Sequence, residues 1–101
     1  MALYFLTCKD REEADKISQT LLDKKLVVCV KKSPVSSQYL WKGSIENSDE
    51  VFLIMDSTEE KFEEIEKVVK NLHSYSLPNL VAIPISSSSK GVSEWLREGL
   101  E

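Results

Sequence analysis

Runs of apolar and β-branched residues recur along the chain, each bounded by polar turn residues, as expected for the strands of a small sheet. Proline cannot donate to a sheet ladder, so the second run is expected to break or bend near Ser33-Pro34. In the third run, the polar stretch Asn47-Ser48-Asp49 is expected to form a bulge or a projecting tip. The pattern predicts four strands, at Ala2–Cys8, Leu26–Trp41, Ile45–Met55 and Asn79–Ile85, with a tight turn at Trp41–Ser44.

Between these runs the apolar residues change to helical spacing, which predicts two main helices and a short terminal one. Each main helix is preceded by a capping pair, a short polar residue followed three positions later by a glutamate. The pairs are Asp10 with Glu13 and Ser57 with Glu60, and the helices run to about Lys25 and to His73, while Val92, Trp95 and Leu96 mark the third helix.

The predicted order, β-α-β-β-α-β-α, matches the ferredoxin-like split βαβ arrangement of the α+β class, with an extra C-terminal helix. The strand order 4-1-3-2 keeps both crossovers of this arrangement right-handed. Pro34 and Pro84 fall in the two strands that this order places at the sheet edges, where a missing N–H is tolerated. A chain of 101 residues supports one core, so residues 1–101 are expected to form a single domain.

The strands are apolar on both faces, as in Leu3–Leu6, Val51–Met55 and Leu80–Ile83. An antiparallel sheet with one face in water alternates apolar and polar residues instead. The two main helices can cover one face, and the short third helix is too small to shield the other. The pattern therefore predicts a homo-oligomer packed through its sheets.

Charge and composition narrow the classes of partner and compartment. The net charge is -4, and no basic stripe is present to neutralise a phosphate backbone, so nucleic acid is not an expected partner. The apolar runs are far shorter than the roughly 20 residues of a membrane helix, and the N-terminus has no leader pattern. Two cysteines outside a Cys-x-x-Cys motif suit reduced thiols. We expect a cytoplasmic protein without membrane contact.

Cys8, Cys29 and His73 are the candidate metal ligands, and each has a plainer alternative. Cys8 lies just before a helix start, which favours a lowered thiol pKa, or it is an ordinary strand-end residue. Cys29 is a ligand, a reactive thiol or a small buried hydrophobe. His73 has a functional role or interacts with the dipole at a helix C-terminus. Strand spacings put the two cysteines roughly 15 Å apart, so a two-cysteine site needs ligands from different subunits.

Four aromatic residues are candidates for an intersubunit interface or for a small-molecule pocket. The four residues are Tyr39, Trp41, Tyr75 and Trp95.

No nucleophile, base and orienting group can be assembled from the sequence, so an enzyme is not expected.

Four motifs, in this order and spacing, make the whole chain resemble the CutA divalent-cation tolerance family: Leu26–Val30, Tyr39–Ile45, His73–Pro78 and Glu94-Trp95-Leu96. The resemblance implies a ferredoxin-like fold, a tight homotrimer related to the trimeric PII signalling proteins, and tolerance of divalent cations, copper especially. It also implies copper ligands at Cys8 and Cys29.

The chain departs from the family pattern at several polar positions. A third family cysteine, in the second helix, has no counterpart, and Lys31 or Lys32 replaces an asparagine. Asp56 and Ser57 stand where the family has Lys-Thr, and Ser76 replaces a glutamate, so an intersubunit ion pair or ligand pocket is expected to have been rebuilt.

Two functions follow as alternatives. One is a trimeric metal-tolerance protein that binds copper, zinc or another divalent cation. The other is a trimeric scaffold or signalling module that binds a small metabolite or a protein in clefts between subunits.

Overall fold

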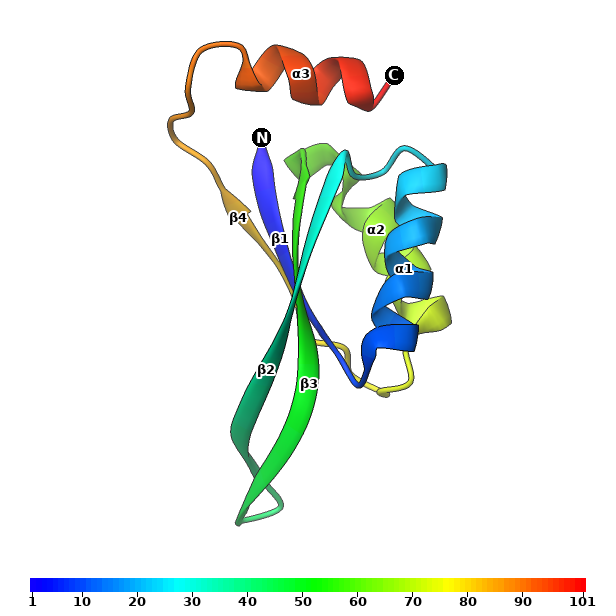
Figure 1. Ribbon diagram of the computed structural model, residues 1–101, viewed down its shortest axis with the longest axis vertical. Helices are drawn as coiled ribbons and strands as arrows, with labels where there is room; N and C mark the ends of the chain where they lie inside the picture. The colour runs from blue at the N-terminus through cyan, green and yellow to red at the C-terminus, as the bar shows by residue number, and fades with distance from the viewer.

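The computed structural model describes residues 1–101 as a four-stranded antiparallel sheet with two helices against one face (Figure 1). The strand order β2-β3-β1-β4 confirms the predicted ferredoxin-like arrangement, with Pro34 and Pro84 in the edge strands β2 and β4. None of the helices combines the length and hydrophobicity needed to cross a bilayer. The elements are β1 (Ala2–Cys8), α1 (Arg11–Asp23), β2 (Cys29–Trp41), β3 (Ser44–Ser57), a 3-10 turn (Glu59–Lys61), α2 (Phe62–Leu72), β4 (Leu80–Pro84) and α3 (Val92–Gly99).

The core lies between the sheet and the helices α1 and α2. Strand β1 alternates fully buried and half-buried residues, because successive side chains of a strand point to opposite faces. Its buried face packs with the apolar stripes of the two helices, and Leu53 and Met55 of β3 complete the layer. The buried members from β1, α1 and α2 are Ala2, Tyr4, Leu6, Cys8, Ala14, Ile17, Leu21, Ile65 and Val69.

The opposite face of the sheet has no helix over it, because α3 lies across one end of the molecule (Figure 1). Val81 and Ile83 of β4 are 44% and 40% exposed there. They pair with Phe5 and Leu3 of β1, and the Phe5 ring meets the Phe52 ring edge-on at 5.3 Å. The isolated chain therefore leaves an apolar sheet face in water, which we call the open face.

The β2–β3 hairpin extends well beyond β1, which ends where Cys8 pairs with Val51. We call residues 35–50, the part of the hairpin beyond this pair, the arm; it projects from the body of the molecule (Figure 1). The arm ends in the predicted tight turn, in which Lys42 and Gly43 have φ of 49° and 81°. Positive φ at both central residues is the type I′ geometry that suits the twist of a hairpin.

The break predicted at Pro34 and the bulge predicted at Asn47–Asp49 are wrong, whereas the alternative that Asn47–Asp49 belong to a projecting part of the hairpin agrees with the arm. The pairing of β2 with β3 runs in one register from Cys29–Asp56 to Trp41–Ser44, without a break at Pro34 or a bulge at Asn47–Asp49. The edge position of β2 tolerates the missing proline N–H. Polar residues fit a regular ribbon in the arm because water reaches both of its faces.

Two element boundaries also differ from the prediction. Ser57 does not cap a helix but stays in β3, where its buried hydroxyl donates to the Leu26 carbonyl at 2.6 Å. Helix α2 therefore begins later, at Phe62, after the 3-10 turn. Strand β2 begins at Cys29 rather than Leu26, because Leu26 and Val27 turn into the core in the connection from α1. The Asp10–Glu13 cap is confirmed, with the Asp10 carboxylate accepting from the Glu13 N–H at 2.9 Å.

Gly99, the last residue of α3, lies close to the side chain of Val28. A Cβ atom added at Gly99 would lie 2.5 Å from Val28 Cγ1. We expect Gly99→Ala to destabilise the protein by about 1–2 kcal/mol in urea unfolding, because overpacking shifts the backbone. In the background of Val28→Ala the same substitution is expected to cost less, and equal costs in both backgrounds would contradict this contact.

Candidate metal centre

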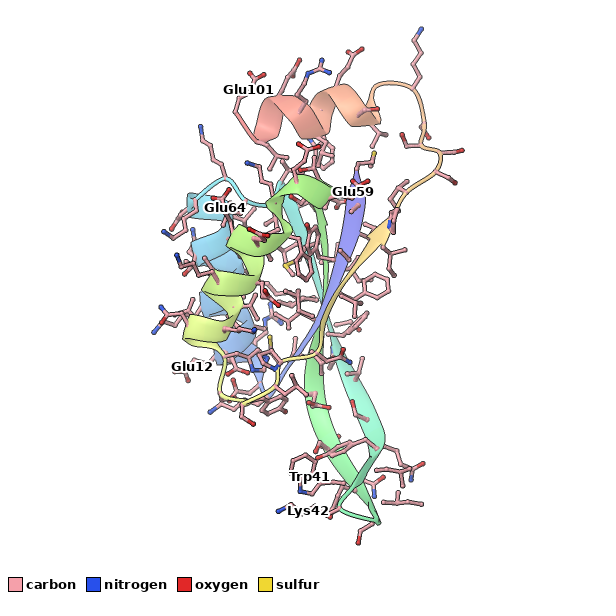
Figure 2. The ribbon with its side chains drawn as sticks, turned by 180° about the vertical axis from the view of Figure 1, so that it is seen from behind. Glu12, Trp41, Lys42, Glu59, Glu64 and Glu101 are labelled. Carbon is pink, nitrogen blue, oxygen red and sulfur yellow. The ribbon has the colours of Figure 1, made fainter.

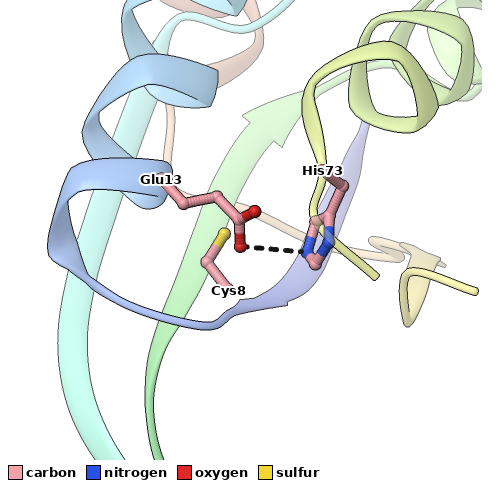
Figure 3. A group of neighbouring side chains, drawn as sticks. All are labelled: Cys8, Glu13 and His73. Atoms are coloured by element: carbon pink, nitrogen blue, oxygen red, sulfur yellow. Dashed lines mark ion pairs between the residues drawn. The ribbon is translucent and has the colours of Figure 1, made fainter. Parts of the chain in front are cut away.

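Three side chains with metal-binding chemistry meet where β1 ends, α1 begins and α2 ends (Figure 3). They are the Cys8 thiol, the Glu13 carboxylate and the His73 imidazole, and their ligand atoms all lie within 4.8 Å of one another. We call these residues the cluster. Cys8 and His73 were predicted as ligands from the sequence, and Glu13 was not.

Local structure explains why the three side chains converge. Cys8 is the last residue of β1 and belongs to its buried face. Glu13 lies in the first turn of α1, where the Asp10 cap fixes its backbone. His73 is the C-terminal cap of α2, and its N–H donates to the Val69 carbonyl at 2.8 Å. Three element ends thus supply one residue each.

Glu13 connects two segments that are far apart in the chain. Its side chain is only 6% exposed, and its carboxylate accepts from the Lys9 N–H at 2.9 Å and from the Ser74 N–H at 2.6 Å. Burial acts to raise the pKa of this carboxyl, but these hydrogen bonds outweigh it and hold the pKa below its ordinary value. Glu13 is therefore a buried, hydrogen-bonded carboxylate at neutral pH.

His73 uses both of its ring nitrogens. The Tyr75 N–H, which can only donate, approaches Nδ1 at 3.1 Å, so Nδ1 is the unprotonated nitrogen. The proton lies on Nε2, which donates to the Thr7 carbonyl at 2.8 Å and lies 3.8 Å from the Glu13 carboxylate. His73 lies at the C-terminus of α2, as predicted, with both ring nitrogens held by hydrogen bonds, and its interaction with the helix dipole stays a prediction.

The prediction of a lowered thiol pKa at Cys8 is wrong. Burial raises its pKa to about 12, and the neighbouring carboxylates of Glu13, Asp10 and Glu50 add to the effect. The negative charges around the sulfur therefore outweigh any effect of the nearby helix start. Cys8 is a protonated thiol at neutral pH and has to lose its proton to bind a cation.

Cys29 lies far from the cluster. It pairs with Asp56, which is opposite Leu3, whereas Cys8 lies five residues further along β1. Strand spacings give a separation of roughly 20 Å between the two cysteines, in keeping with the expectation that they share no site within one chain. Participation of Cys29 in a site between subunits stays a prediction.

Two of the residues that depart from the family pattern contact each other beside Cys29. The Lys31 ammonium lies 3.6 Å from the Asp56 carboxylate and 3.5 Å from the Cys29 sulfur. These neighbours raise the pKa of Lys31, with Cys29 the larger influence and Asp56 next. The two substitutions thus form an ion pair between adjacent strands of one chain.

The four candidate aromatic residues do not line one pocket in the chain. Tyr39 and Trp41 belong to the arm, with Trp41 at its tip (Figure 2), and Trp95 belongs to α3. Tyr75 alone adjoins the cluster, with its ring centroid 4.8 Å from that of His73. All four are between 38% and 57% exposed, so their role at an interface between subunits stays a prediction.

A signal for Glu13 was present in the sequence. Helical spacing puts position 13 on the same face as Ile17 and Leu21, both fully buried, so a carboxylate faces the core there. In the sequence, Glu13 was explained as the partner of Asp10 in a helix cap, so its position on the core-facing side of the helix was not considered. A charged residue on the apolar stripe of a helix needs partners, and here Lys9 and Ser74 provide them.

Comparison with known proteins identifies close relatives. The family model described as CutA1 divalent ion tolerance protein matches residues 2–99. The divalent-cation tolerance protein CutA of Archaeoglobus fulgidus is 39% identical over 97 residues, which are 96% of this chain and 95% of that protein. The protein of the same name from Thermotoga maritima is 32% identical over 100 residues, 99% of both chains.

Solved structures extend the similarity to the fold. The periplasmic divalent cation tolerance protein CutA from Archaeoglobus fulgidus matches with a TM-score of 0.96 at 38% identity, over 100% of both chains. The divalent cation tolerance protein from Thermus thermophilus matches with a TM-score of 0.94 at 32% identity, over 98% of both chains. The fold predicted from the sequence is thus shared with these proteins over their whole length.

Proposed function

The chain belongs to the CutA1 divalent ion tolerance family, and on this basis we propose that it binds a divalent cation through Cys8, Glu13 and His73 as a homotrimer. Divalent-cation tolerance is the function that it shares with its relatives. The observation that carries the site assignment is the convergence of thiol, carboxylate and imidazole within 4.8 Å. No other group of histidine, cysteine and acidic side chains in the structure has this geometry.

The donor set fits a borderline cation such as copper or zinc. Thiolate and imidazole are the ligands that these ions favour, and a carboxylate completes many zinc sites. A tetrahedral ion with bonds of about 2.0–2.3 Å needs ligand atoms roughly 3.5 Å apart, so the cluster has to contract by about 1 Å. The residue types of the cluster therefore suit such a cation, whereas the distances between their ligand atoms are still too long for coordination.

The residues of the cluster give up existing contacts to hold a cation. Cys8 loses its proton, and at least one nitrogen of His73 leaves its hydrogen-bond partner. The Glu13 carboxylate gives up part of its hydrogen bonding to the Lys9 and Ser74 N–H groups when it coordinates the cation. Because these contacts offset part of the gain from coordination, we expect weaker binding than at a preformed zinc site.

Calorimetric titration of the reduced protein with zinc and with copper tests the site. We expect Cys8→Ser and His73→Ala each to weaken binding at least tenfold, because each removes a ligand. Cys29→Ser is the matched control, since it alters a cysteine outside the cluster, and it is expected to keep the wild-type affinity. Unchanged binding in the first two variants, or a loss with Cys29→Ser, would contradict the assignment and favour a site between subunits.

The open face supports the homotrimer. Its apolar residues, such as Val81 and Ile83, are exposed in the single chain, and a partner sheet would bury them. The exposed aromatic residues Tyr39, Trp41 and Trp95 offer further contact area for neighbouring subunits.

A cytoplasmic location is part of the proposal and rests on the low cysteine content, two residues without a Cys-x-x-Cys motif. Free thiols persist in a reducing compartment. The relative from Archaeoglobus fulgidus is described as periplasmic, so fractionation of the native cells decides between the two compartments.

A trimeric scaffold without a cation site is the second candidate function. The observation that favours it is that every buried polar side-chain atom already has a hydrogen-bond partner, as in a purely structural cluster. A catalytic role has less support, because Cys8 is a protonated thiol and both nitrogens of His73 are engaged. Absence of zinc and copper binding in the titration would favour the scaffold.

A further inference from the structure

The segment after His73 is held in place by the cluster itself. Two consecutive backbone amides donate to it, the Ser74 N–H to Glu13 Oε1 at 2.6 Å and the Tyr75 N–H to His73 Nδ1 at 3.1 Å. The second of these bonds depends on the position of the imidazole proton, because Nδ1 accepts only while the proton is on Nε2. The position of Tyr75 therefore depends on the tautomer of His73.

Cation binding through either nitrogen of His73 is incompatible with this bond. If Nε2 binds the cation, the neutral ring carries its proton on Nδ1, and two N–H groups then point at each other. If Nδ1 binds the cation, it displaces the Tyr75 N–H directly. Tyr75 is released from His73 in both cases, whereas Ser74 can remain on Glu13 Oε1 as a pivot.

Tyr75 links this event to the base of the arm. Its ring lies against the imidazole, and its hydroxyl donates to Glu50 Oε2 at 2.6 Å. Burial, and next the hydrogen bond to Glu50, raise the pKa of Tyr75, so the hydroxyl keeps the proton that it donates. Glu50 is 9% exposed and pairs with Val35, the first residue of the arm. One side chain thus connects the cluster to the base of the arm.

We propose that His73 acts as a tautomer switch, through which cation binding in the cluster releases Tyr75 from His73 and from Glu50 at the base of the arm. The inference rests on the proposed cation site, and it adds a way in which cation binding changes the contacts of Tyr75 at the base of the arm. Tyr75 is a positioning residue in this scheme, because it contacts the ligand residue His73 and not the cation.

The switch makes an unusual prediction about Tyr75→Phe. The phenylalanine keeps the ring against His73 and the backbone N–H but removes the bond to Glu50, which in this scheme breaks when the cation binds. Zinc affinity is therefore expected to rise, by roughly tenfold for one charge-assisted hydrogen bond. A merely structural Tyr75 would instead loosen the cluster and lower the affinity.

Tyr39→Phe is the matched control. Tyr39 also has a hydroxyl contact, within the arm, to the Ser48 hydroxyl at 3.0 Å, but this hydroxyl bonds neither to Glu50 nor to a residue of the cluster. We expect zinc affinity to be unchanged in this variant. Equal or lower affinity in Tyr75→Phe than in the wild type, or an equal rise in Tyr39→Phe, would overturn the switch.

Nitrogen NMR of His73 in the full-length protein gives a second readout. Without zinc we expect the Nε2–H tautomer, and with saturating zinc a proton on Nδ1 or a directly coordinated Nδ1, with faster hydrogen exchange at the Tyr75 amide. A proton on Nδ1 in the zinc-free protein would overturn the switch whether or not zinc binds. Absence of zinc binding in the titration would instead refute the cation site itself, so the two failures are distinguishable.

Discussion

Val81→Glu is expected to convert the assembled protein into monomers. Val81 is 44% exposed on the open face, so the folded single chain can accept a glutamate there with its charge in water. In a sheet-packed assembly the same charge would be buried without a partner, which costs about 3–5 kcal/mol for each interface. Light scattering at micromolar concentration should show a fall to the monomer mass of 11.5 kDa.

Leu22→Glu provides the control for this prediction. Leu22 is similarly exposed, at 38%, but it lies on α1, on the helix side of the sheet. We expect this variant to assemble like the wild type and to lose little stability. A monomeric wild type, or equal dissociation in both variants, would contradict assembly through the open face.

The fold was predictable because its signals are local and mutually consistent. Strands that are apolar on both faces, the Asp10 cap and the positions of Pro34 and Pro84 all agree with one strand order. The errors occurred where a residue has a tertiary partner that the pattern does not contain. Ser57 resembled a helix cap, but the Leu26 carbonyl keeps it in the sheet.

The candidate site was less predictable, because its chemistry depends on neighbours that are distant in sequence. Cys8 precedes a helix start, which is a local signal for a low pKa, whereas Glu50 adds a negative charge from another strand. Likewise, the tautomer of His73 is set by Thr7 and Tyr75, of which only Tyr75 is near in sequence. Residue type identified two members of the cluster, and only the fold identified their protonation states.

The contrast between the two cysteines bears on which thiol is the metal ligand. Cys29 is partly exposed beside Lys31, whereas Cys8 is fully buried with a pKa of about 12. The more accessible sulfur therefore lies away from the imidazole and the carboxylate. Exposure of a thiol therefore does not identify the metal ligand here, because the complete donor set is formed around the buried sulfur.

Glu13→Gln is expected to be the most destabilising single substitution in the cluster. The glutamine has one carbonyl oxygen for the two N–H donors of Lys9 and Ser74, and its amide group would turn a donor toward the other. Loss of a buried charged acceptor and an unsatisfied N–H together should cost about 2–4 kcal/mol in urea unfolding. Glu12→Gln is the control, since Glu12 is an exposed neighbour on the same helix and should change stability by less than about 0.5 kcal/mol.

The same carboxylate should leave a signature in the pH dependence of stability. Because the folded state lowers the pKa of Glu13 below the ordinary 4.5, the unfolded chain binds its proton first as the pH falls. The stabilisation from Glu13 is therefore complete well above pH 4.5 and is lost as the pH falls below that value toward the folded-state pKa. Urea midpoints measured across this range should fall more steeply for the wild type than for Glu13→Gln, which has no proton to bind at this position. Parallel curves would mean that Glu13 is not held as a carboxylate in the folded protein.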